Sequence, residues 1–239
     1  MGILLISLAG ALTAGLGAGI FFGWVGAILP AVVAFAAAYF LLGRRVNQAL
    51  EQGLLAVQRE IQKGPAHVPT ALSALHALKK QYGKMQFFAS SSIDGQIGTI
   101  LFLQNKHEEA RPYLERAFVR VWHAKLMLAV LLHKKKDFAA IDELLEKTAR
   151  YTPKQGLLYS TWAWMHWKAG HEAKALEILN KGRAALGEAD TVLNANLLAL
   201  QNGHKMKMKG YGQVWYQFGL EQHPMEKRAQ RGNVRYARR

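Results

Sequence analysis

The chain has 239 residues, with 31 Lys and Arg against 16 Asp and Glu and a formal net charge of +15. This length allows one or two domains, and the positive charge favours anionic partners such as lipid headgroups, acidic proteins or nucleic acid. Because there is no Cys, disulfides and thiolate metal sites are excluded.

The first predicted element is a transmembrane hairpin within residues 1–43, where positions 2–43 hold no charged residue, His, Asn or Gln. At ~1.5 Å per residue, one helix of this length is roughly twice as long as the hydrocarbon core of a bilayer is thick. Two spans fit better, at Ile3–Phe22 and Val25–Leu42, with Gly23 breaking the helix between aromatic rings. A signal peptide is the weaker interpretation, because its apolar core is only about 7 to 15 residues long.

Small residues recur every four positions in the first span, at Ala11, Gly15, Gly19 and Gly23. This spacing places them on one helix face, where they allow another backbone to approach closely. Two interpretations are open: the face packs against the second span, or it docks a different membrane protein or a second copy. In the second span, Pro30 is expected either to kink the helix or to mark its start.

The orientation of the hairpin is indicated by Arg44 and Arg45, which follow the second span directly. By the positive-inside rule, this end of the span and the N-terminus are expected in the cytoplasm. A large following domain weakens the rule, so an extracytoplasmic placement is the alternative.

Residues 44–88 are predicted to form connecting helices. Apolar residues at helical spacing over Val46–Gln62 indicate an amphipathic helix that continues the second span without a break. A second helix is expected to begin at Pro69, with Leu72, Leu75 and Leu78 inward, and to stop at Gly83.

Residues 89–224 are predicted to contain repeated helical hairpins. Lys106–Trp122, Lys136–Pro153 and Lys168–Gly187 share a turn, a small or aliphatic residue, a large apolar residue four later and a small residue three after that. These triplets are Ala110-Leu114-Ala117, Ile141-Leu145-Thr148 and Ala175-Leu179-Gly182, and twelve positions before each lies Gly98, Ala129 or Ala163. A degenerate fourth copy is expected over residues 189–224, and residues 46–83 are a candidate divergent first copy.

This pattern resembles the tetratricopeptide repeat, whose second helix reads A-x-x-x-F-x-x-A and often ends at Pro, as here at Pro153. The chain departs from the family pattern because the first helices lack the Trp near their start, and Thr148 and Gly182 replace Ala. The resemblance implies an α-solenoid that binds a protein partner in a concave groove.

The resemblance also places six side chains on the groove: Phe102, Leu126, Val130, His133, Trp164 and Trp167. Packing in the core or next to the membrane is the alternative for this stripe, and Trp162 is expected between helices. The Lys and Asn pattern with which some family members clamp a C-terminal carboxylate is absent, since Gly95, Leu126 and Ser160 stand where its first Lys is expected. The groove is therefore expected to hold an apolar helix or an extended peptide.

A basic tail is predicted over residues 225–239, where a single acid, Glu226, accompanies Lys227, Arg228, Arg231, Arg235, Arg238 and Arg239. Near a membrane, each basic residue contributes on the order of 1 kcal/mol to binding anionic headgroups. An acidic face of a protein complex is the alternative partner, and nucleic acid is disfavoured because no recognition motif accompanies the charge.

No catalytic, cofactor-binding or metal-binding motif is found, and the nine His are scattered. The sequence therefore predicts a non-enzymatic, all-α protein without a cofactor. We expect a scaffold anchored in a bacterial inner membrane, with its soluble part holding a protein partner at the cytoplasmic face. The alternative is an integral structural subunit of a membrane complex, packed through its Gly-rich hairpin.

Overall fold

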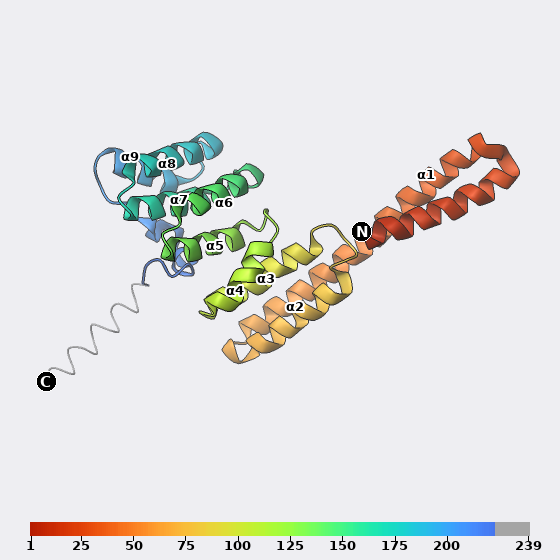
Figure 1. The fold of residues 1–239 in the computed structure, drawn as a ribbon, viewed down its shortest axis with the longest axis horizontal. Helices are drawn as coiled ribbons and strands as arrows, with labels where there is room; N and C mark the ends of the chain where they lie inside the picture. The colour runs from red at the N-terminus through yellow and green to blue at the C-terminus, as the bar shows by residue number, and fades with distance from the viewer. Residues whose placement is uncertain (223–239) are drawn as a thin grey trace. The chain divides into compact units, whose positions relative to one another are not determined.

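The computed structural model describes residues 1–222, except for the side chains of Phe21, Phe22 and Trp24. Every regular element in this range is a helix, so the predicted all-α class is confirmed for it (Figure 1). The elements are α1 (Gly2–Gln62), η1 (Pro65–His67), α2 (Val68–Tyr82), α3 (Ala89–Leu103), α4 (His107–Arg116), α5 (Trp122–Lys134), α6 (Phe138–Tyr151), α7 (Gly156–Lys168), α8 (Glu172–Leu186), α9 (Thr191–Gln201), η2 (Met208–Tyr211) and α10 (Gln213–Tyr216).

The helices form two compact units. The first comprises residues 1–100 with 116–118, and the second comprises residues 101–115 and the chain from Val119 onward. The division falls inside α3 and α4, whereas the sequence had suggested a boundary at residue 88. Helices α3 and α4 therefore each contribute to both units, and each unit is described separately.

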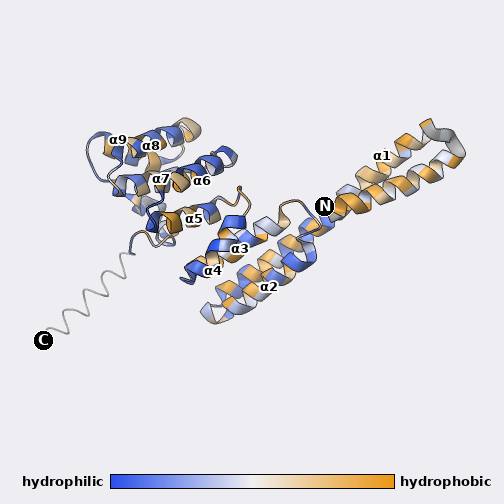
Figure 2. Ribbon diagram, in the orientation of Figure 1, coloured by the Kyte–Doolittle hydropathy of each residue, from blue (hydrophilic) through white to orange (hydrophobic). Residues whose placement is uncertain are grey.

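The hairpin at the start of the first unit turns at Gly23, whose φ of 71° and ψ of 174° interrupt the helical geometry of α1. The two arms, Gly2–Ile20 and Val25–Gln62, are both long and apolar enough to span a membrane. Hydrophobic colouring follows the first arm and the start of the second, and it gives way to a mixed pattern along the part of α1 that runs beside α2 (Figure 2). Pro30 lies inside the second arm and does not mark its start.

Small residues bring the two arms together. A Cβ atom on Gly15 would lie 3.1 Å from the Cβ of Ala31, and one on Gly19 would lie 3.6 Å from the Cβ of Ala27. Ala11 is buried one turn earlier on the same stripe. Gly15 and Gly19 thus lie against the second arm, which favours the first interpretation, and docking of another protein stays a prediction. A Cβ atom on Gly23 would meet nothing within 4 Å, and this residue forms the turn.

The second arm continues without interruption to Gln62, as predicted, and pairs with α2. A Cβ atom on Gly53 would lie 2.5 Å from Leu78 Cδ2, so this glycine allows the pair to approach closely. Leu75 is fully buried, and the bounds of α2 agree with the helix expected from Pro69 to Gly83.

A buried carboxylate ties α2, α3 and α4 together in the first unit. Asp94, 2% exposed, accepts a hydrogen bond from Lys79 Nζ at 2.6 Å, and its other oxygen lies 3.6 Å from Arg116 Nε. Because the charge is paired on both oxygens, its burial is compensated.

Helices α5 to α9 of the second unit pack each against the next, and α7 also contacts α5 and α9. The nine residues of the predicted triplets are buried, as are Gly98, Ala129 and Ala163. Gly182 marks the closest approach, because a Cβ atom there would lie 2.6 Å from Leu193 Cδ1 and 2.9 Å from Tyr159 Cβ. The repeat solenoid and membership of the tetratricopeptide family both stay predictions.

The predicted fourth hairpin is only half formed. Its first helix is α9, in which Leu193, Leu197 and Leu200 are buried as expected. In place of its second helix, the described part of residues 214–222 contains only the end of the four-residue α10. Gly212 and Gly219 both adopt φ of 64°, which interrupts helical geometry on each side of α10. The prediction of a full second helix is therefore wrong for the described residues.

Candidate functional sites

The first candidate site is the predicted groove face of the second unit, where aromatic rings from three segments meet. The His133 ring of α5 lies 6.2 Å from the Trp164 ring of α7, and the Trp164 ring lies 5.2 Å from that of Trp215 in α10. Both pairs meet edge to face, a favourable arrangement of aromatic rings. The structure thus brings two predicted groove residues together with a third ring that was not predicted.

The predicted groove residues are mostly covered. Phe102, Leu126, Val130 and Trp164 are buried, whereas His133 and Trp167 are half-buried. Residues 213–222, which we call the cover segment, contribute Trp215 and Phe218, and both side chains are buried. An apolar segment thus lies against the groove face, and it comes from the chain itself.

The cover segment is held by polar contacts as well. Tyr211, just before it, donates a hydrogen bond to Asp190 Oδ1 at 3.1 Å, and its oxygen lies 2.8 Å from Ser160 Oγ. Burial raises the pKa of Tyr211, so the hydroxyl remains protonated. Within the segment, Trp215 Nε1 donates to Glu221 Oε2 at 3.0 Å. Sequence reasoning missed this anchor because it assigned residues 214–224 to a helix.

An open cavity of about 620 Å³ lies beside the cover segment. Phe102, Leu103, Asn105, His107 and Lys134 form one side, and residues between Gln213 and Gln222 form the other. It combines apolar rings with polar groups, as ligand sites commonly do.

A basic group and an imidazole share one wall of this cavity. Lys134 Nζ lies 3.1 Å from His107 Nε2. Burial and then the Lys134 charge lower the pKa of His107, so a neutral imidazole accepts the hydrogen bond from the ammonium. The wall therefore presents positive charge to whatever enters the cavity.

Two other Trp side chains of α7 differ in burial. Trp162 is buried between helices and donates from Nε1 to Asp142 Oδ1 at 2.7 Å, and the same oxygen lies 2.8 Å from His166 Nε2. Trp167 is half-buried, with Lys168 Nζ 5.0 Å from its ring centroid in a cation–π contact.

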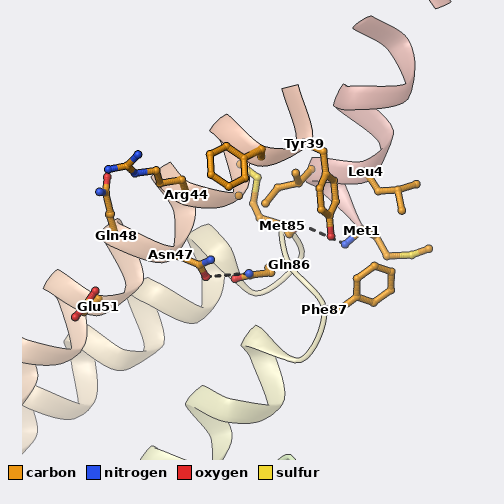
Figure 3. A pocket seen from close by; sticks show the side chains of 13 residues that line it. Met1, Leu4, Tyr39, Arg44, Asn47, Gln48, Glu51, Met85, Gln86 and Phe87 are labelled. Carbon is orange, nitrogen blue, oxygen red and sulfur yellow. Dashed lines mark hydrogen bonds between the residues drawn. The ribbon is translucent and has the colours of Figure 1, made fainter. Parts of the chain in front are cut away.

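The second candidate site is a pocket of about 470 Å³ at the base of the hairpin (Figure 3). Its walls come from the start of the first arm, from the second arm where the apolar run ends, and from the loop between α2 and α3. Lining residues are Met1, Ile3, Leu4, Tyr39, Phe40, Gly43, Arg44, Asn47, Gln48, Glu51, Met85, Gln86 and Phe87. No sequence motif had indicated this pocket.

Hydrogen bonds hold the three walls of the hairpin-base pocket together. The backbone N–H groups of Gly2 and Ile3 donate to the carbonyl oxygens of Lys84 and Met85 at 2.9 and 3.1 Å. These carbonyls satisfy two of the unpaired N–H groups that begin a helix. Gln86 Nε2 also donates to Asn47 Oδ1 at 2.9 Å (Figure 3). The pocket is thus formed by elements fixed to one another.

Two further points of the sequence analysis concern metal binding and the basic tail. Among residues 1–222, no group of three or more His, Asp or Glu side chains lies in a metal-binding arrangement. The basic tail from Lys227 to Arg239 lies outside the described residues. No protein-family model, curated protein sequence or solved structure matches the chain.

Proposed function

We propose that the protein is a membrane-anchored adaptor, whose hairpin inserts into a bacterial inner membrane and whose helical repeats hold a protein partner at the cytoplasmic face. The main observation in support of membrane insertion is the outer surface of the hairpin. Large apolar side chains there are exposed, among them Leu12, Leu16, Ile20, Val25, Leu29 and Val33, each at least 59% accessible. A surface of this extent is typical of a membrane or partner contact.

The continuous second arm supports a rigid tether. It runs from Val25 to Gln62, about 57 Å at ~1.5 Å per residue, and so extends well past one bilayer core. Arg44 and Arg45 follow the apolar part and favour the cytoplasmic orientation. Gly15 and Gly19 face the other arm of the hairpin. This packing favours the function of a membrane tether over that of a structural subunit that docks on a complex through the same face.

The groove face with its cavity is the proposed partner site. The cover segment supports a site for an apolar stretch with aromatic rings, because Trp215 packs on Trp164. A partner segment of similar composition, with an acidic group opposite Lys134, fits the open cavity. Tethering at the membrane raises the effective concentration of such a partner.

The anchor is tested by washing membranes with alkaline carbonate, and its orientation by thiol labelling. Since the chain has no Cys, Leu198→Cys introduces a single thiol at a 61% exposed position. The proposal expects the chain in the membrane pellet and the thiol modified by an impermeant maleimide only in inverted vesicles. Release by carbonate, or labelling in intact cells, would contradict it.

The partner site is tested by photo-crosslinking in cells with a photoreactive amino acid at Leu103, which lines the cavity. Leu198 is the matched control, a similarly exposed Leu on α9 outside the cavity. A specific product at Leu103 that weakens in a Lys134→Glu variant is expected. Equal products at both positions would refute the assignment of the cavity.

A further inference from the structure

We infer that the hairpin-base pocket binds one phospholipid, with its acyl chains against Leu4, Tyr39, Phe40 and Phe87 and its phosphate on Arg44. This inference rests on the proposed insertion of the hairpin into a membrane. It goes beyond that function because it assigns a specific, stoichiometric lipid site to named residues.

The polarity of the pocket matches that of a phospholipid. Along α1 its lining changes from Tyr39 and Phe40 to Arg44, Asn47, Gln48 and Glu51. These positions extend over about 18 Å at ~1.5 Å per residue, so one end of the pocket is apolar and the other is polar. The apolar end belongs to the arm that is apolar enough to cross a bilayer.

The loop between α2 and α3 adds an aromatic wall on the side opposite the second arm. Phe87 and Phe88 are 50% and 57% exposed, although they are large and apolar. The Phe88 ring stacks on that of Phe118 at 4.3 Å, whereas Phe87 lines the pocket. Exposed large apolar side chains that gather on one surface mark a contact with a membrane or a ligand, and the proposed insertion of the hairpin brings this loop close to the bilayer.

Charge identifies the polar end as a phosphate site. Arg44 is the one cationic side chain among the lining residues, and within residues 1–222 it forms no ion pair, whereas the Met1 ammonium donates to the Lys84 and Met85 carbonyls. Glu51 lies about two turns further along α1, so it faces the headgroup beyond the phosphate. A guanidinium binds phosphate oxygens with two parallel hydrogen bonds, and Asn47 and Gln48 offer further polar groups beside it.

The volume and construction of the pocket also suit a bound amphiphile. At about 470 Å³ it lies within the range of roughly 300 to 1,000 Å³ that is common for ligand sites. Its walls are joined by the Gly2, Ile3 and Gln86 hydrogen bonds, so little ordering is required when a lipid enters. A lipid there would bridge the first arm, the second arm and the loop.

The test is native mass spectrometry of the full chain in mild detergent, titrated with phosphatidylglycerol. The wild type is expected to retain one lipid, and Arg44→Gln is expected to lower this affinity about tenfold, as loss of a charge-assisted contact predicts. Arg45→Gln is the matched control, since it removes the neighbouring charge that does not line the pocket, and it should change affinity less than twofold. Phe87→Ala should weaken retention several-fold, and Leu41→Ala should not.

Two further probes separate the possible outcomes. Phosphatidylethanolamine should bind through the same phosphate, whereas diacylglycerol, which lacks it, should not be retained. Equal losses in the Arg44 and Arg45 variants, or disappearance of a dimer peak instead of a lipid peak, would overturn the inference. The carbonate wash is performed on the same variants: a chain that stays in the membrane without selective lipid retention refutes the pocket alone, and a chain released from the membrane refutes the anchor.

Discussion

The hairpin and the helical repeats both pair antiparallel helices through small residues, yet they place large apolar side chains in opposite directions. In the hairpin, Gly15 lies against Ala31 while Leu16 next to it is 64% exposed. In the repeats, Gly182 lies against Leu193 and Tyr159 while Leu179 is fully buried. Small residues set how close the helices come in both regions, and the surroundings decide where the large ones are stable.

The same contrast holds for polar groups. Positions 2–43 contain no Asp, Glu, Lys, Arg or His side chain, so the hairpin needs no buried ion pairs. The repeats bury Lys125, whose Nζ donates to the carbonyl oxygens of Leu114 and Glu115 at 3.0 and 2.8 Å, near the end of α4. Carbonyls at a helix C-terminus lack partners within the helix, so this lysine satisfies them.

The largest expected effect concerns whether the glycine face of the hairpin is internal. In a Gly19→Cys, Ala27→Cys variant, the Cβ atoms are about 3.6 Å apart, within the range that disulfides require. Oxidation should therefore give nearly complete intramolecular closure, measured by non-reducing electrophoresis and intact mass. Gly17→Cys, Ala27→Cys is the control, because Gly17 has no neighbour within 4 Å. Covalent dimers in place of closed monomers would show that this face docks a second copy.

Removing the ring that covers the groove face should have the largest effect on stability. Trp215 is fully buried against Trp164, so Trp215→Ala is expected to cost about 3 to 5 kcal/mol of unfolding free energy. Chemical denaturation in detergent measures this loss. Val214→Ala alters the adjacent, 46% exposed residue and should be nearly neutral. Similar losses in the two variants would mean that the cover segment is not packed on the repeats.

The buried lysine should make the stability of the repeats depend on pH. Burial, assisted by the Lys147 charge, lowers the pKa of Lys125 to about 8. As the pH rises from about 8 to about 10.5, the folded chain releases this proton before the unfolded chain does. The free energy of unfolding should therefore rise over this range, by at most ~3 kcal/mol. Denaturation of the wild type and of Lys125→Met across this range measures it, and identical pH profiles would exclude the shift.

The smallest expected effect is on stability, when the same Gly→Ala substitution is made once in the repeats and once in the hairpin. Gly182→Ala places a methyl group 2.6 Å from Leu193 Cδ1 and should destabilise by about 1 to 3 kcal/mol. Gly17→Ala meets nothing within 4 Å and should be neutral or stabilising by up to ~1 kcal/mol. Thermal unfolding of each variant in detergent measures the difference. If the Gly182→Ala variant were as stable as the wild type, the distances from α8 to α7 and α9 would have to be larger than described.

Much of the fold could be predicted from local pattern. The turn at Gly23, the unbroken helix to Gln62 and the start of α2 beside Pro69 all follow from apolar runs and helix-breaking residues. The buried triplets of the repeats were also expected, because a spacing of three and four residues places side chains on one helix face. The prediction of a second helix in the last hairpin was wrong. The apolar and aromatic residues there are compatible with a helix, but Gly212 and Gly219 interrupt helical geometry on each side of α10.

The candidate sites were predicted less completely. A stripe such as Leu126, Val130 and Trp164 has the same spacing whether it faces a groove, a core or a segment of its own chain. Contacts between distant residues decide among these, and here Trp215 lies against Trp164. The hairpin-base pocket could not be predicted either, because its walls are also formed by residues that are distant in the sequence.

By itself, therefore, the sequence determined the helical class, the apolar hairpin with its turn, and the small residues at which helices approach. These features depend on neighbours within about one or two helical turns, so the spacing of residues along the sequence is enough to predict them. Only the tertiary structure decided that residues 213–222 cover the groove face and that Ile3 and Met85 close a pocket beside Arg44. Both depend on packing between residues many positions apart. Bringing such residues together costs chain entropy, and the contacts offset this cost only when the whole unit folds.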